Sequence, residues 1–267
     1  MSTFVPGHQV PGFFMLTNNQ VKFIRSLQLK KFRDIHHQFV AEGTKLVLDL
    51  LQEQHPVRAV YALQEWISEH PVNPGTELVE AAEKELQRIT SLTTAPPVIA
   101  VFDISSVIPD PASAENELVL LLDDIRDPGN LGTIIRIADW FGIRQIVCSE
   151  STVDLYNPKV VQSTMGSIAR VKVHYTDVCV YLEKLSKPVK VYGTTLDGEN
   201  LYNLHLSASG IIVIGSESTG ISGQVKKYLT KKLFIPSFGA SNHAESLNAS
   251  VATAVVCAEF RRQTMLQ

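Results

Sequence analysis

The sequence LVLLLDDIRDPGNLGTIIRIA, residues 118–138, contains the feature that decides the fold. It opens with the continuous apolar run Leu118–Leu122, which is typical of a strand covered on both faces of a parallel sheet. Two acids end the run, and Pro128, Gly129 and Gly132 favour a sharp turn before an apolar helix begins. This order of strand, polar turn and helix predicts an α/β fold with a polar site at the carboxyl edge of a parallel sheet.

Two polar residues of this stretch are candidates for a functional role. Asn130 can hydrogen-bond peptide groups on either side of the turn. Arg136 follows near the start of the expected helix, where the helix dipole slightly disfavours a cation unless an anion faces it. From the residues alone two interpretations stay open for Arg136: a solvated arginine, or an arginine that binds an anionic ligand.

Composition indicates a globular protein with a reduced interior. The 267 residues are 45% hydrophobic, and this length favours two domains. No stretch reaches the roughly 20 apolar residues of a membrane span, and the N-terminus lacks the pattern of a secretory signal. Because Cys148, Cys179 and Cys257 are scattered through apolar segments, we expect reduced core residues in a cytoplasmic protein.

The net charge of −3 hides a basic window near the N-terminus. Between Gln20 and Lys45 there are six cations against two acids. Such a local excess can contact RNA phosphates, and a solvated helix face is the alternative on charge alone. The candidate RNA-binding residues of this window are Lys22, Arg25, Lys30, Lys31 and Arg33.

The first hundred residues predict a small α/β domain. We expect a loose tail over 1–14, a domain over 15–108, a linker over 109–116 that is rich in Pro, Ser and acids, and a second domain over 117–267. The elements expected in the first domain are helices over 20–32, 43–54 and 77–87 and strands over 57–63 and 98–102.

From residue 117 onward, strand-like runs alternate with helical segments, which predicts parallel βαβ units. The expected strands cover 119–122, 145–148, 171–174, 189–194, 211–214 and 232–235. One helix follows the first turn, and the others are expected over 159–165, 178–185, 221–229 and 247–262.

Three segments of this second domain place turn residues after a strand. They are DPGNLG (127–132), GSESTGIS (215–222), and IPSFG (235–239) with the following ESLNASVA (245–252). Loops at the carboxyl ends of parallel strands are where open α/β sheets bind ligands. The glycine patterns of dinucleotide and NTPase phosphate sites are absent from the sequence, and its histidines are dispersed, so we expect neither of these sites and no metal.

Together the three segments resemble the three motifs of the SpoU, or TrmH-like, family of RNA ribose methyltransferases in the SPOUT superfamily. The family pattern is an Asp-Pro-x-Asn-x-Gly turn with an Arg-x-Ala helix, then Gly-x-Glu-x-x-Gly, then Ile-Pro with Ser-Leu-Asn-x-Ser-x-Ala. All three occur here in the family's order. The resemblance covers residues 116–267, and residues 19–102 also resemble the family's frequent N-terminal substrate-binding module.

The resemblance implies an α/β SPOUT domain in which a parallel sheet ends in a deep trefoil knot, an exception to the usual avoidance of knots. It also implies a small N-terminal α/β domain that binds the RNA substrate. The methyl donor would be S-adenosylmethionine, and the knotted domains of two chains would form a homodimer. Carried over by motif, the donor-binding residues are Gly193, Thr194, Gly215, Glu217, Ile235, Ser246 and Leu247.

The same motifs imply the catalytic residues, which are Arg136, Asn130, Glu217, Ser246 and Asn248. A ribose 2′-hydroxyl is a poor nucleophile until its proton leaves, so catalysis requires orientation and help with one proton. Because arginine is ordinarily too basic to lose its proton, we expect Arg136 to hold an RNA phosphate and stabilise the developing alkoxide. A general-base role for Arg136 is the alternative.

We therefore expect a 2′-O-ribose methyltransferase that acts on structured RNA, and the N-terminal module favours ribosomal over transfer RNA. Two alternatives come from other classes: a non-catalytic RNA-binding or ribosome-assembly protein on the same fold, and a nucleotide-dependent oxidoreductase on an open sheet. The segment 240–245 is longer than the family's compact loop, so His243 or Glu245 either approaches the donor or lies in an exposed bulge.

Overall fold

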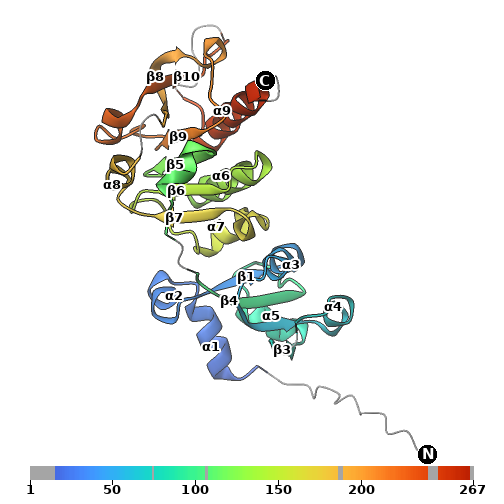
Figure 1. Cartoon of the computed structure of the whole chain (residues 1–267). Coiled ribbons are helices and arrows are strands. Elements are labelled where there is room, and N and C mark those ends of the chain that lie inside the picture. The colour runs from blue at the N-terminus through green and yellow to red at the C-terminus, as the bar shows by residue number, and fades with distance from the viewer. Residues whose placement is uncertain (1–15, 74, 106–107, 186–188, 240–245, 265–267) are drawn as a thin grey trace, which may run out of the picture. The chain divides into compact units, whose positions relative to one another are not determined.

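The computed structural model describes residues 16–264, except 74, 106–107, 186–188 and 240–245 (Figure 1). The chain divides into two compact units between Ile104 and Ser105. The whole predicted tail over 1–14, and the segment 240–245 with His243 and Glu245, lie outside the described residues. Within the described part of the chain, no helix is long and apolar enough to cross a bilayer.

The N-terminal unit is built on a four-stranded sheet in the order β1-β4-β2-β3, in which only β2 and β3 run parallel. Helices α1 and α5 pack on it through Ile24, Leu86 and Ile89, which meet Ile99 and Val101 of the sheet in one apolar cluster. The elements are α1 (Asn18–Ser26), α2 (Lys30–His36), β1 (Gln38–Glu42), α3 (Thr44–Gln52), β2 (Val57–Ala62), α4 (Gln64–Glu69), β3 (Glu77–Glu80), α5 (Glu83–Ile89) and β4 (Val98–Asp103).

Several elements of this unit differ from the sequence predictions. The single helix expected over 20–32 is two helices, because Leu29 is extended, with φ −98° and ψ 130°, and separates α1 from α2. Residues 77–80 form β3 beside β2 instead of the first turn of a helix, and α5 begins only after the extended residue Ala82. Strand β1 and helix α4 were not expected. Pairing with a neighbouring strand decides such short segments, and local propensity does not report it.

The second unit is a six-stranded sheet in the order β10-β8-β9-β5-β6-β7, and every neighbouring pair is parallel, as predicted. Its elements are η1 (Pro111–Glu115), β5 (Leu118–Asp123), α6 (Pro128–Trp140), β6 (Gln145–Cys148), α7 (Pro158–Ser163), η2 (Ser167–Ala169), β7 (Lys172–Tyr175), α8 (Val178–Glu183), β8 (Val191–Asn200), η3 (Leu201–Asn203), β9 (Gly210–Gly215), η4 (Val225–Tyr228), β10 (Lys231–Phe234) and α9 (Ala249–Thr264).

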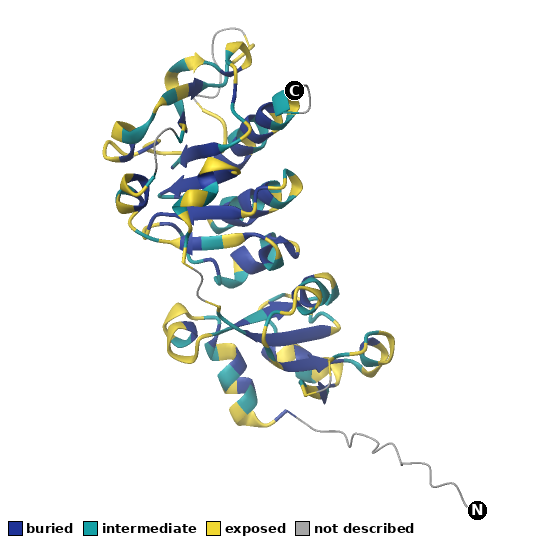
Figure 2. Ribbon diagram, in the orientation of Figure 1, coloured by how far each residue is buried: buried dark blue, intermediate teal, exposed yellow. Residues whose placement is uncertain are grey.

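The sheet of this unit is covered on both faces, which explains its continuous apolar strands. Val119, Leu121 and Val213 pack with Tyr181 of α8 and Val225 of η4 on one face. Helices α6, α7 and α9 lie on the other side of the sheet (Figure 1). Figure 2 shows the central strands as almost entirely buried. Leu118–Asp123 is buried throughout, as expected for a strand between two helical layers.

The strand order brings the three predicted turns to one edge of the sheet. From β5 the chain continues to β6 on one side, whereas β9 and β8 lie on the other side. The ends of β5 and β9 are in register, since Asp123 pairs with Gly215. This change of direction is a topological switch point, where open α/β sheets bind ligands.

Besides β8, which runs to Asn200 and not to residue 194, two segments of the second unit differ from the prediction. Residues 221–229 contain the short 3-10 helix η4 instead of an α-helix, because the Ser222 backbone N–H is bound by Asp123 at 2.7 Å and the glycine-containing turn continues past it. Residues 111–115, expected within a linker, form η1, and Ala114 is buried in the apolar cluster of the sheet. The three cysteines also divide: Cys148 and Cys257 are buried, whereas Cys179 is only half-buried.

Candidate active site

Asp127 holds the first turn, which connects β5 to α6. The Asp127 carboxylate caps α6 by accepting a hydrogen bond from the Asn130 backbone N–H at 2.9 Å, and Pro128 occupies the first helical position. Gly132 lets α6 approach α7 closely, because a Cβ there would lie 2.4 Å from Cβ of Ser163. These local contacts place the Asn130 side chain at the end of the sheet.

The second turn depends on the absence of a side chain at Gly215. A Cβ at this position would lie 2.3 Å from the carbonyl carbon of Gly220, since the turn folds back on itself. The Gly220 N–H donates to the Ser216 carbonyl at 2.8 Å, and Gly220 has a φ of +66°. The tight turn presents Glu217 at its tip.

Side chains from the first and third turns meet at Glu217. Oε1 of Glu217 accepts hydrogen bonds from Asn130 Nδ2 and from the Ala249 backbone N–H. Asn248 Nδ2 donates to Asn130 Oδ1 at 2.8 Å. Asn248 Oδ1 in turn accepts from the Ser250 and Val251 backbone N–H groups and so caps α9. We call Asn130, Glu217 and Asn248 the polar junction, because it joins three segments that are distant in sequence.

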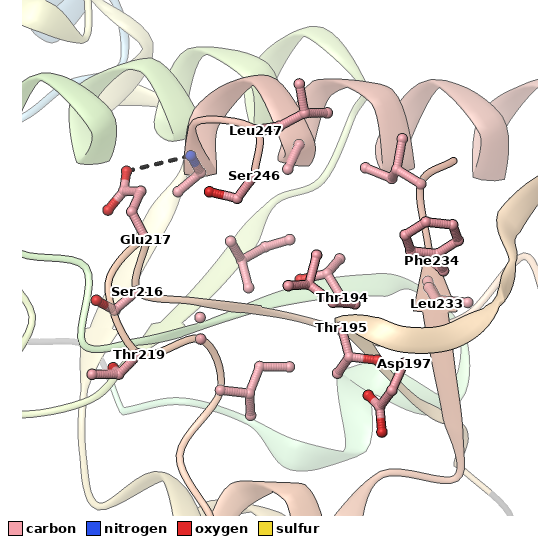
Figure 3. Close-up of a pocket in the computed structure, with 18 of the residues that line it drawn as sticks. Thr194, Thr195, Asp197, Ser216, Glu217, Thr219, Leu233, Phe234, Ser246 and Leu247 are labelled. Carbon is pink, nitrogen blue, oxygen red and sulfur yellow. Dashed lines mark hydrogen bonds between the residues drawn. The ribbon is translucent and has the colours of Figure 1, made fainter. Parts of the chain in front are cut away.

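A pocket of about 730 Å³ opens beside the polar junction (Figure 3). Its volume is within the range of small-molecule sites. Six of the seven predicted donor-binding residues line it: Thr194, Gly215, Glu217, Ile235, Ser246 and Leu247. Its walls are apolar at Ile214, Leu233 and Phe234, and they carry hydroxyl groups and two carboxylates elsewhere.

Two predicted residues lie elsewhere than expected. Gly193 is buried and does not line the pocket; a Cβ there would lie 2.5 Å from Leu229 Cδ1, so its role is close packing of β8 against this side chain. Arg136 is exposed on α6 and outside the pocket. Within the described residues its guanidinium makes no hydrogen bond or ion pair, which leaves it available for an external anion.

The sequence interpretation missed a segment of β8 that lines the pocket. Thr195, Leu196 and Asp197 follow Thr194 there, and Lys226 contributes from η4. Residues 194–198 form an arch in β8 between two stretches that pair with β10. The dipeptide Asp197-Gly198 is a turn signal and was the one available indication of this arch.

The basic residues of the N-terminal unit do not all face solvent. Lys22 and Arg25 are exposed on α1, and Lys31 is exposed on α2. Lys30 forms an ion pair with Asp34 at 3.0 Å. Arg33, a predicted RNA-binding residue, is buried, and its Nη1 donates to the Leu27 carbonyl at 2.8 Å. It therefore holds the break between α1 and α2 and is removed from the candidate RNA surface.

The chemistry of the pocket suits an organic ligand with both apolar and cationic parts. Apolar walls and hydroxyl groups match a nucleoside, and the carboxylate of Glu217 matches positive charge. Gly215 brings bare backbone to the pocket wall, which allows close approach of a ligand. Across the described ranges, no group of three or more His, Cys, Asp or Glu side chains is arranged to hold a metal ion.

Comparisons with known proteins agree with this geometry. Residues 117–258 match the SpoU rRNA methylase family, and residues 18–100 match the MRM3-like substrate binding domain. The chain is similar to the 23S rRNA (guanosine(2553)-2′-O)-methyltransferase RlmP of Bacillus subtilis, with 30% identity over 246 residues, which are 91% of this chain and 96% of the relative.

Solved structures show the same fold. A TrmH-family protein from Porphyromonas gingivalis superposes with a TM-score of 0.85 and 39% identity, over 94% of this chain and all of that chain. An rRNA methyltransferase from Sinorhizobium meliloti, solved with bound AdoMet, gives a TM-score of 0.81 and 30% identity, over 92% of this chain and 95% of that chain. With its three motifs joined at the polar junction beside one pocket, this chain belongs to the SpoU rRNA methylase family.

Proposed function

We propose that this protein transfers a methyl group from S-adenosylmethionine to a ribose 2′-hydroxyl of ribosomal RNA. The observation that carries the proposal is the polar junction at the edge of a pocket of about 730 Å³. The family supports the reaction class, and the names of the relatives from B. subtilis and S. meliloti support ribosomal RNA over transfer RNA.

The pocket residues hold the donor in this proposal. The apolar side chains of Ile214, Leu233 and Leu247 contact the adenine, and the Thr194 hydroxyl and the exposed Ser246 provide hydrogen bonds. The Glu217 carboxylate faces the cationic part of the donor. When bound, S-adenosylmethionine supplies a methyl group on a sulfonium, which is electrophilic without further activation.

The polar junction orients the acceptor ribose. Both hydrogen bonds to Glu217 end on Oε1, so Oε2 accepts none from the described residues and is available to a ribose hydroxyl. Asn130 and Asn248 fix the position of this carboxylate and so restrict the ribose to one geometry. Arg136 binds the RNA phosphate and stabilises the alkoxide that develops as the 2′-hydroxyl loses its proton.

The N-terminal unit contributes affinity for RNA. The exposed cations Lys22, Arg25 and Lys31 supply sequence-independent phosphate contacts, and each contact releases counterions. The match of residues 18–100 to a substrate binding domain supports this role. Cytoplasmic RNA is the expected substrate pool.

A homodimer of the second unit completes the site in this proposal. Trp140 is 84% exposed at the end of α6, one turn beyond Arg136, and Val251 is 49% exposed on α9, which packs against α6. Contact between two copies would cover this apolar surface and bring Arg136 of one chain toward the pocket of the other. The deep trefoil knot that the resemblance implies also remains a prediction.

The direct test is methylation of RNA that lacks the modification. RNA from cells without the gene is incubated with the purified protein and S-adenosylmethionine, digested, and mapped by mass spectrometry. The proposal predicts one new 2′-O-methylated nucleotide in ribosomal RNA. A methyl group on transfer RNA alone would support the tRNA alternative, and a methylated base would contradict the reaction class.

A further inference from the structure

Asp197 lies in the arch of β8 that lines the pocket, and no motif assigns it a role. Strand β10 pairs with β8 at Tyr192 and Gly193, and pairing resumes only at Glu199. The arch between these positions turns the carboxylate-bearing residue Asp197 into the pocket lining. In Figure 3 Asp197 and Glu217 lie on opposite sides of the pocket. Asp197 therefore faces a part of the ligand that is remote from the polar junction.

The arch is held in place by β10. A Cβ on Gly198 would lie 2.7 Å from the carbonyl carbon of Leu233, so the two backbones are in direct contact. Lys232 Nζ donates to Asp197 Oδ2 at 2.6 Å. This hydrogen bond lowers the pKa of Asp197, which is therefore ionised at neutral pH.

Stability alone does not account for this ion pair. The side chains of Asp197 and Lys232 are 68% and 45% exposed, and ion pairs this exposed contribute little to folding. The pair does fix the direction of the carboxylate. A carboxylate offers about four acceptor sites, so Asp197 keeps acceptor capacity beyond the one that Lys232 uses.

The charge of Lys232 decides which ligand group Asp197 accepts. Because the ammonium of Lys232 offsets the carboxylate charge, attraction to a second cation is weakened, whereas the ability to accept hydrogen bonds from neutral hydroxyl groups remains. A pair of adjacent hydroxyls matches the two oxygens of one carboxylate. The adenosine ribose of the proposed donor carries such a pair.

We propose that Asp197 accepts hydrogen bonds from the vicinal hydroxyls of the donor's adenosine ribose, an inference that rests on the proposed function. Asp197 is then a donor-binding residue that contacts S-adenosylmethionine and its demethylated product S-adenosylhomocysteine equally, since both carry the same ribose.

Calorimetric titration of the full-length protein tests this assignment. Asp197→Ala should weaken the binding of both S-adenosylmethionine and S-adenosylhomocysteine about tenfold, the usual effect of losing a charged hydrogen bond. Removing the 2′-hydroxyl from S-adenosylhomocysteine should cost the wild type a similar factor and cost Asp197→Ala almost nothing. Glu199→Ala is the matched control, because Glu199 forms an equivalent 2.6 Å ion pair with Lys231 but does not line the pocket.

The outcomes separate this inference from the proposed function. A loss confined to S-adenosylmethionine would overturn it in favour of recognition of the sulfonium charge. The inference would also be overturned if removal of the 2′-hydroxyl from S-adenosylhomocysteine weakened binding equally in wild type and Asp197→Ala, or if Asp197→Ala bound both compounds with wild-type affinity. Donor binding, and with it the proposed function, would stand in both cases. If the wild type bound neither compound, the proposed function itself would fail.

Discussion

The two units of this protein use the same side-chain chemistry in opposite ways. In the N-terminal unit Glu42 is 6% exposed, and both of its oxygens accept hydrogen bonds from Thr90 and Ser91. In the second unit Glu217 is exposed and uses only Oε1. The difference teaches that a saturated, buried carboxylate secures a loop, whereas a carboxylate with an unused oxygen at a pocket is available to a ligand.

Two of the three arginines predicted as RNA contacts, Arg33 and Arg136, repeat this contrast. Arg33 is 3% exposed and bound to the Leu27 carbonyl. Arg136 is exposed, and no described residue binds its guanidinium. Both were predicted from the sequence as RNA contacts, so only the surroundings separate a scaffold residue from a candidate for catalysis.

The largest effect on methyl transfer is expected at Arg136, the exposed arginine. Arg136→Ala should reduce the rate of methyl transfer about 10²- to 10³-fold, because stabilisation of the developing alkoxide is lost. Single-turnover assays with radiolabelled S-adenosylmethionine measure this rate, and calorimetry should give a donor affinity within about twofold of wild type. Turnover at the wild-type rate would contradict the role assigned to Arg136.

A second prediction compares the same substitution at Glu217 and at Glu42. Glu217→Gln should slow methyl transfer about 10- to 100-fold and leave the thermal midpoint nearly unchanged, because the residue is exposed. Glu42→Gln should lower the free energy of unfolding of the N-terminal unit by about 2 kcal/mol, since buried partners lose a charged acceptor. Urea titration measures the second effect. If Glu217→Gln unfolded the protein instead, Glu217 would be a structural carboxylate like Glu42, and the proposed difference between the two would be wrong.

The exposed cations of α1 should have a moderate effect that depends on salt. Replacing Lys22 and Arg25 together by Gln should weaken RNA binding about tenfold and reduce the slope of log K against log salt by about 1.4 to 1.8. Filter binding across a salt series measures both quantities. The control is Lys30→Gln, because Lys30 already pairs with Asp34. If Lys30→Gln changed the RNA affinity and the salt slope as much as the double variant does, the unpaired cations would not be the preferred phosphate contacts.

The smallest effect is expected at a carboxylate of the second unit that is buried and hydrogen-bonded like Glu42. It tests whether these surroundings, and not the unit in which the carboxylate lies, make it a structural residue. Glu259 of α9 is 6% exposed and bound by Arg262 and Gln263, which lower its pKa, the Arg262 hydrogen bond most of all. A lowered pKa stabilises the fold above the ordinary value near 4.3, and this contribution is lost as the pH falls through the folded-state pKa.

Glu259→Gln should therefore lower the thermal midpoint at pH 7 and approach wild type below about pH 4. Methyl transfer by the folded variant should be unchanged. Scanning calorimetry across this pH range measures the difference, and a gap between the two proteins that widens in acid would be inconsistent with a lowered pKa of Glu259 in the folded protein.

The sequence was sufficient for the parallel sheet and for the convergence of its three turns. The continuous apolar run Leu118–Leu122 and the glycine turns fix those features locally. Burial of Arg33 was not predictable, because it depends on a break at Leu29 that an amphipathic pattern does not report. The arch at Asp197 depends on pairing between β8 and β10, whose residues lie more than thirty positions apart.

Gly193 shows that a motif alone does not predict where each of its residues lies. It adjoins Thr194, which lines the pocket, yet strand alternation turns it toward Leu229. Adjacent residues of a strand face opposite sides, so the position of a single residue requires the register as well as the motif.

The most direct test of the central claim is the product of the reaction at the polar junction. Ribosomal RNA lacking the modification is incubated with S-adenosylmethionine and either wild-type protein or Glu217→Gln, and nucleosides are quantified by mass spectrometry. We expect a 2′-O-methylated nucleoside that forms with the wild type and falls about 10- to 100-fold with the variant. A base-methylated product, or a yield that is the same for both proteins, would contradict this account.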